Sequence, residues 1–165
     1  MRYLIRHADA GDKRAWTRPD VERPLSNLGL RVAHGLVALL AAYPIGQIVS
    51  SPAVRCIQSV QPLAERRSLE VRVDGALGVD ADLDLTMALL MAPTGDDAVL
   101  CTHGELIKPL LGRLRDLGAP IGERVRAPKG SVWLLDSVDG SVPRAAYLPP
   151  PGRDDVARPG ARPGP

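Results

Sequence analysis

The chain has 165 residues, enough for one domain with a complete hydrophobic core. Its hydrophobic content of 45% and charged content of 24% are ordinary for a globular protein, and its net charge of +2 is too small to indicate a polyanionic partner. Aromatic residues make up only 3% of the chain, which argues against stacking on nucleic-acid bases, so we expect no nucleic-acid partner.

Predicted strands and helices alternate along the first half of the chain. Short apolar runs predict strands at residues 2–6, 47–50 and 69–73. A polar loop that contains Gly and Pro follows the first strand, over residues 8–24. Ser26 is placed to cap a helix over residues 27–42. Pro52 precedes a second helix, predicted over residues 53–67.

The second half continues this alternation. A loop rich in Asp, residues 75–84, leads into a short predicted helix over residues 85–91. Residues 98–102 form a continuous apolar run, which is typical of a strand buried on both faces. A helix over residues 105–117 follows, and Gly118 is in position to end it. The last predicted elements are two strands and the turn between them, at residues 131–135, 144–148 and Asp139-Gly140.

This alternation predicts an α/β fold of three layers, a mostly parallel sheet with helices on both faces. The domain is expected to span residues 1–148. Residues 149–165 are rich in Pro and Gly and are expected to be a disordered or extended tail. No apolar run approaches the roughly 20 residues of a membrane helix, and the N-terminus does not have the shape of a signal peptide. We therefore expect a cytoplasmic protein with no membrane partner; nothing in the sequence indicates its oligomeric state.

Four polar segments lie directly after predicted strands. They are Arg6-His7, the segment from Ser51 to Arg55, the loop around Asp80, and His103-Gly104. In an open α/β sheet, ligands bind in the crevice beyond the carboxyl ends of the strands. The four segments are therefore expected to meet in one site.

The residue types in these segments suit a phosphoryl group. Its negative charge is spread over oxygen atoms, which Arg side chains bind with two parallel hydrogen bonds. A histidine nucleophile must be unprotonated, and the ordinary pKa of His is about 6.5. The positive charge of Arg6 disfavours protonation of His7 beside it. The pattern thus favours transfer of a phosphoryl group to His7.

At this point the chain resembles a known family. Residues 4–8, Leu-Ile-Arg-His-Ala, resemble the Arg-His-Gly signature of the histidine phosphatase superfamily. Residues 51–59, Ser-Pro-Ala-Val-Arg-Cys-Ile-Gln-Ser, resemble its second motif, Ser-Pro-x-x-Arg-x-x-Gln-Thr, and Thr102-His103-Gly104 resembles its third. The resemblance covers about residues 1–148. It implies the phosphoglycerate-mutase-like fold and a hydrolase that needs no metal ion or other cofactor.

The resemblance also implies roles for particular residues. His7 would be the nucleophile that becomes phosphohistidine, and Arg6, Arg55 and His103 would bind the phosphate. The short chain and the run Glu22–Ser26 look most like the SixA-type phosphohistidine phosphatases and the similar domain that follows some Nudix hydrolase domains. In that branch Arg23 would reach the substrate. Phosphohistidine proteins, nucleotides and small phosphorylated molecules all remain possible substrates.

Two departures from the family pattern concern catalysis. Ala8 replaces the usual Gly, which is harmless if the backbone φ angle there is negative. No clear general acid is visible: we select Asp80, close to Asp82 and Asp84, with Asp9 and Glu105 as fallbacks. The resemblance to the SixA-type branch implies that no strong acid is required, because a protonated imidazole leaves easily.

Three other functions are weighed against a phosphatase. A metallohydrolase could use the pair His7-x-Asp9 with His103, but Arg6 and Arg55 would repel the cation. A regulatory module could bind phosphate without turnover, although it would not need the nucleophile. A phosphoglycerate mutase would carry an extra lid between the second and third motifs, for which this chain is too short.

Overall fold

The computed structural model describes residues 1–92, 97–136 and 144–152, and within them a six-stranded sheet with the order β3-β2-β4-β1-β5-β6. The strands are β1 (Arg2–Arg6), β2 (Gln47–Ser50), β3 (Val71–Val73), β4 (Ala98–Thr102), β5 (Val132–Asp136) and β6 (Arg144–Leu148). β3, β2, β4 and β1 run parallel to one another, whereas β5 pairs antiparallel with β1 and β6 pairs antiparallel with β5. The prediction of a mostly parallel sheet is confirmed.

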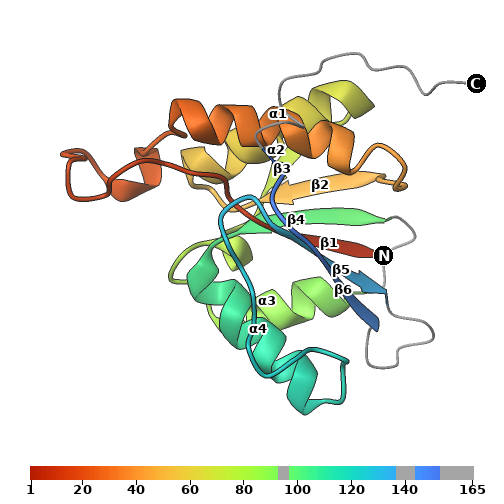
Figure 1. Cartoon of the computed structure of the whole chain (residues 1–165). Coiled ribbons are helices and arrows are strands. Elements are labelled where there is room, and N and C mark those ends of the chain that lie inside the picture. The colour runs from red at the N-terminus through yellow and green to blue at the C-terminus, as the bar shows by residue number, and fades with distance from the viewer. Residues whose placement is uncertain (93–96, 137–143, 153–165) are drawn as a thin grey trace, which may run out of the picture.

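Helices cover both faces of this sheet, so the three-layer prediction is also confirmed. Figure 1 shows α1 (Asn27–Leu39) and α2 (Val54–Arg67) on one face, and α3 (Leu83–Met91) and α4 (Gly104–Asp116) on the other. Two short 3-10 helices, η1 (Asp20–Glu22) and η2 (Gly75–Leu77), lie in the loops that follow β1 and β3.

Alternate residues of the central strands fill two separate core layers. In β1, Tyr3 and Ile5 pack in the layer under α1 and α2, whereas Leu4 packs in the layer under α3 and α4. This alternation follows from the two-residue period of a strand. Strand β4 lies between β1 and β2 and all five of its residues are buried, as the continuous apolar run predicted. Cys56 and Cys101 are both small buried residues of the first layer.

Most predicted elements agree with the structure to within a few residues. Ser26 caps α1, since its side chain accepts a hydrogen bond of 3.1 Å from the backbone N–H of Gly29. Gly118 follows α4 with a φ of +101°, the conformation that favours glycine after a helix. Both capping predictions are confirmed.

Three boundaries differ from the predictions. β3 begins at Val71 rather than at residue 69, because the backbone N–H of Leu69 bonds to the oxygen of Ala64 and so finishes α2. α1 ends three residues earlier than predicted, at Leu39. The predicted loop of residues 75–84 contains η2 and the start of α3, where Asp82 is the N-cap.

Two predictions fall wholly or partly outside the described residues. The turn at Asp139-Gly140 is one of them. The other is the tail from residue 149, of which only the first four residues, 149–152, are described, so the domain boundary at residue 148 stays a prediction. Within the part of the chain that the structure describes, no helix is long and apolar enough to cross a membrane.

Candidate active site

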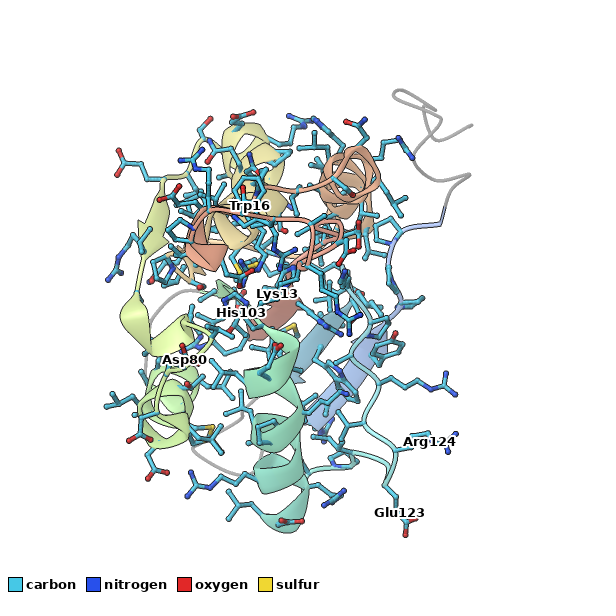
Figure 2. The ribbon with its side chains drawn as sticks, turned by 90° about the vertical axis from the view of Figure 1, so that its left-hand side faces the viewer. Lys13, Trp16, Asp80, His103, Glu123 and Arg124 are labelled. Carbon is cyan, nitrogen blue, oxygen red and sulfur yellow. The ribbon has the colours of Figure 1, made fainter. Side chains whose placement is uncertain are left out.

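The carboxyl ends of four neighbouring parallel strands bring the predicted segments together. His7 continues β1 and His103 continues β4, and the backbone N–H of His7 donates to Thr102 O at 3.0 Å. Ser51 continues β2, and its N–H donates to Cys101 O at 2.9 Å. The chain after β3 reaches Asp80, and Figure 2 shows Asp80 and His103 on the same face of the molecule. The expected convergence is present.

His7 is held in one orientation next to His103. Its side chain is 5% exposed, and its ring lies 5.3 Å from that of His103, centre to centre. His7 Nδ1 lies 2.7 Å from the backbone oxygen of Ala8, a group that only accepts hydrogen bonds. Nδ1 therefore carries the proton and donates it, which assigns the lone pair to Nε2.

The pKa of His7 is lowered from 6.5 to about 3. Burial is the largest cause, and the electrostatic effects of His103, Arg55 and Arg6 act in the same direction. The bond to the oxygen of Ala8 opposes them but is outweighed. His7 is thus neutral at pH 7, as a nucleophile must be.

His103 is buried among hydrogen-bonding groups. Its Nδ1 lies 3.3 Å from Arg55 Nη2, and its Nε2 lies 2.8 Å from Ser51 Oγ. Since a guanidinium only donates, Nδ1 is the acceptor and Nε2 carries a proton toward Ser51. Ser51 belongs to the Ser-Pro motif, so the second and third motifs are in direct contact through this pair of side chains.

Within the described part of the chain, each of the two site arginines has one buried N–H without a hydrogen-bond partner. Arg55 is 2% exposed and donates from Nη1 to Asp20 O at 2.6 Å and from Nη2 to Asp20 Oδ2 at 3.0 Å. Arg6 Nη1 donates to Ala127 O at 2.6 Å. The Nε atoms of both side chains are buried and have no partner among the described residues. Buried donors are normally satisfied, so these two are suited to receive an anion.

Two small residues of the motifs fit this arrangement. A side chain at Gly104 would place its Cβ 2.7 Å from Arg6 Cζ, so only glycine leaves room for the guanidinium. Ala8 is fully buried and is not among the described residues with positive φ, which shows that replacing the usual Gly costs no backbone strain. Its N–H donates to Ser59 Oγ at 2.9 Å, which joins the first motif to the second.

A cavity of about 430 Å³ opens next to Arg55 and His103. Its lining is mostly small or apolar and includes Asp80: Asp20, Val21, Ser51, Pro52, Ala53, Arg55, Gly75, Gly78, Val79, Asp80, Ala81 and His103. The lining does not include Arg6, His7 or Arg23. Asp80 is exposed and makes no interaction within the described part of the chain.

The other acidic candidates are engaged elsewhere. Asp82 caps α3, and Asp84 pairs with Arg113. The carboxylate of Asp9 accepts hydrogen bonds from Lys129 at 2.6 Å and from Ser26 at 2.7 Å. These bonds, that from Lys129 above all, lower the pKa of Asp9 to about 2. Asp9 is therefore held as the ionised partner of Lys129, and it does not line the cavity.

Glu105 is exposed at the start of α4 and is not suited to be an acid either. Partial burial raises its pKa, but its own backbone N–H and the electrostatic effects of His103, Arg6 and His7 outweigh burial and lower it. Of the acidic residues considered from the sequence, only Asp80 lines the cavity.

Arg23 does not line the cavity but is hydrogen-bonded to Asp20, which does. It is 8% exposed and donates from Nη1 to Ala10 O at 2.6 Å and from Nε to Asp20 Oδ1 at 2.8 Å. Asp20 was missed by the sequence analysis. The only signal for it was its place three residues before Arg23, a spacing at which side chains of one helical turn meet.

Comparison with known proteins agrees with these observations. The family model of the histidine phosphatase superfamily (branch 1) matches residues 2–78. An 8-oxo-(d)GTP phosphatase of Mycolicibacterium smegmatis is 29% identical over 153 residues, which cover 90% of this chain. The alignment covers 48% of that relative, so this chain spans about half its length.

Solved structures share the fold over nearly the whole chain. A protein of Agrobacterium tumefaciens assigned as the phosphohistidine phosphatase SixA matches with a TM-score of 0.69 at 26% identity, covering 90% of this chain and 97% of that one. A mycobacterial glucosyl-3-phosphoglycerate phosphatase matches with a TM-score of 0.64 at 19% identity, covering 88% and 95%. The matched motifs and the shared fold make the chain similar to members of the histidine phosphatase superfamily.

Proposed function

We propose that this chain is a phosphatase that works through a phosphohistidine intermediate on His7. The observation that carries the proposal is the state of His7: buried, neutral, with Nδ1 bonded to Ala8 O and the lone pair on Nε2. A histidine that served only the fold would not need two buried guanidinium N–H groups and a second histidine beside it.

In the first step, Nε2 of His7 attacks the phosphorus atom and the bond to the leaving group breaks. The Nε–H groups of Arg6 and Arg55 are suited to bind the phosphoryl oxygens, where negative charge must be stabilised. His103 completes the polar wall of the pocket. Asp80 is the acid in this proposal and gives its proton to the leaving group.

In the second step, water attacks the phosphorus atom of phosphohistidine. The N–P bond breaks, inorganic phosphate forms and His7 returns to its neutral state. Asp80, now a carboxylate, takes the proton that the water loses. The two steps together consume one water molecule and leave the enzyme unchanged.

The proposed reaction is independent of metal ions, because the guanidinium groups supply the positive charge. The carboxylate of Asp9, which a metal-binding pair with His7 would require, is instead bonded to Lys129 and Ser26. We therefore expect activity to be unaffected by EDTA.

We infer that the substrate carries a good leaving group. Asp80 is exposed and held by no other described side chain, so it is a weakly positioned acid. A weakly positioned general acid suffices to cleave phosphohistidine, a phosphoanhydride or an aryl phosphate, whose leaving groups need little protonation. It does not suffice for an alkyl phosphate. The relatives support the first two classes: one is an 8-oxo-(d)GTP phosphatase and another is assigned as a phosphohistidine phosphatase.

The proposal is tested by trapping the intermediate. The protein is mixed with an excess of an aryl phosphate, quenched in alkali to preserve phosphohistidine, and analysed by peptide mass spectrometry. A phosphoryl group is expected on His7, and the His7→Ala variant should show neither the adduct nor turnover. His34, which is exposed on α1, provides the control His34→Ala with wild-type behaviour. Turnover with a phosphoryl group on any other residue would contradict the proposal.

A further inference from the structure

The guanidinium of Arg55 has two hydrogen-bonding edges, and Asp20 accepts both hydrogen bonds of one of them. The end-on edge consists of Nη1 and Nη2, and both donate to Asp20, the first to its backbone oxygen and the second to its carboxylate. The side-on edge consists of Nε and Nη2. Nη2 faces His103 Nδ1 at 3.3 Å, and Nε is buried without a partner among the described residues. The edge left open is therefore the one beside His103.

Asp20 is itself held in place by Arg23, which is also hydrogen-bonded to the loop that follows His7. Its Oδ1 accepts a hydrogen bond from Arg23 Nε at 2.8 Å, while its Oδ2 accepts from Arg55. Arg23 also donates to the backbone oxygen of Ala10, three residues after His7. Asp20 thus sits between two arginines with one carboxylate oxygen for each.

The charges favour an ionised Asp20. Burial raises the pKa of its carboxyl, but the hydrogen bond from Arg23 and the positive charge of Arg55 outweigh burial and lower it. The exposed Lys13 adds a third positive charge 3.8 Å from Oδ2. The carboxylate and the two buried arginines form one hydrogen-bonded group beside the site.

We propose that Asp20 is a positioning residue, which turns the Nε edge of Arg55 toward the phosphoryl group. This inference rests on the proposed function, because it assigns Arg55 to phosphate binding. An arginine side chain has many rotamers, and holding it in its bound orientation removes an entropic cost from binding and from the transition state. Although Asp20 also lines the cavity, its proposed role is exerted through Arg55 and not by contact with the reacting atoms.

A competing role of Asp20, in which it occupies the donors that phosphate needs, would change the affinity for a phosphate analogue in the opposite direction. If Asp20 competed with phosphate for the same donors, it would have to leave before phosphate bound. Its removal would then tighten the binding of a phosphate analogue. A positioning role predicts weaker binding, so the direction of the effect separates the two.

The test measures orthovanadate binding by titration calorimetry and aryl phosphate hydrolysis by steady-state kinetics. Loss of a charge-assisted contact predicts that Asp20→Ala weakens vanadate binding about 10- to 100-fold, with a similar loss of kcat/KM. Asp20→Asn keeps the backbone oxygen and one side-chain acceptor and should lose less. Glu22→Ala is the matched control, because Glu22 lies on the same helix η1 and pairs with Arg18 instead. It should bind vanadate like the wild type.

A double-mutant cycle shows whether Asp20 acts through Arg55. In the Arg55→Ala background, Asp20→Ala should cause no further loss of vanadate affinity or of kcat/KM. Circular dichroism verifies that each variant is folded, and Asp20→Asn carries the test if Asp20→Ala is not. Unchanged binding, tighter binding or additive losses in the cycle would each overturn the inference.

The same data separate this inference from the proposed function. If the wild type binds vanadate without hydrolysing any aryl phosphate, the proposed function fails, and the loss of affinity in Asp20→Ala still supports the inference. If the wild type does not bind vanadate at all, Arg55 is not an anion ligand and both proposals are overturned.

Discussion

His7 donates a hydrogen bond of 2.7 Å from Nδ1 to the backbone oxygen of Ala8, its own neighbour in the chain. This contact needs no distant partner, yet it determines which nitrogen of the ring is free to act as a nucleophile. Combined with burial, which lowers the pKa of His7 to about 3, it yields a neutral imidazole with a defined tautomer.

The lowered pKa of His7 predicts a pH dependence of stability. The unfolded chain takes up a proton on this histidine as the pH falls through 6.5, whereas the folded chain does so only near pH 3. The contribution of neutral His7 to the free energy of unfolding is therefore complete above pH 6.5. It is lost as the pH falls toward 3, by up to about 1.4 kcal/mol per pH unit. Urea unfolding of the wild type and of His7→Asn between pH 7 and pH 4 measures this difference. Parallel curves for the two proteins would show that the pKa of His7 is not lowered.

Arg55→Ala should remove donors aimed at the phosphoryl oxygens. We expect a loss of roughly 2–4 kcal/mol of transition-state stabilisation, seen in kcat/KM for an aryl phosphate. Vanadate inhibition should weaken in the same variant. Arg66→Ala is the control, because Arg66 is exposed on the same helix, α2. Unchanged vanadate inhibition in Arg55→Ala would remove Arg55 from the phosphate pocket.

Gly104→Ala should damage activity more than stability. The added Cβ would lie 2.7 Å from Arg6 Cζ and 2.8 Å from Arg6 Nε, so the guanidinium must move away. The far end of a long side chain can shift without unfolding the domain, but Arg6 then no longer presents Nε to the phosphoryl group. The expected result is a loss of kcat/KM of at least about tenfold, the factor that corresponds to 1.4 kcal/mol, in a folded protein.

Gly112→Ala provides the comparison on the same helix. A Cβ at Gly112 meets no atom within 4 Å, so activity should be retained. Since alanine favours a helix over glycine, stability should rise by about 0.5–1 kcal/mol. Thermal melts measure the stability of both variants, and kinetic assays measure their activity. If both variants kept wild-type activity, the close approach of Arg6 to Gly104 would have no catalytic role.

Asp80→Asn should affect substrates according to their leaving groups. Acid catalysis contributes typically 10²–10⁴-fold and matters most when the leaving group is basic. Turnover of an alkyl phosphate should therefore fall much more than turnover of a nitrophenyl phosphate. Asp84→Asn serves as the control, since Asp84 pairs with Arg113 on the surface. Equal losses across a series of leaving groups would show that Asp80 is not the acid.

Short-range patterns were sufficient to predict most of the fold and the centre of the site. The apolar run at residues 98–102 forms β4, and Ser26 caps α1, because each depends on neighbours a few residues away. The meeting of Arg6, His7, Arg55 and His103 was predictable too, since parallel strands must end at one edge of the sheet. Local competition explains one of the three boundaries that differ, since Leu69 completes α2 instead of joining β3.

The tertiary structure alone decided what each charged loop residue does. Asp9 and Asp20 look alike in the sequence, as acidic residues of one polar loop. The first bonds to Lys129, 120 residues away, and the second to Arg55, 35 residues away. Because of these partners, Asp9 has a lowered pKa and forms an ion pair with Lys129. Asp20 instead forms a hydrogen-bonded ion pair with Arg55. Sequence patterns cannot show such pairs, because the energy of a charge depends on which opposite charges folding brings within hydrogen-bonding distance and how far water is excluded around them.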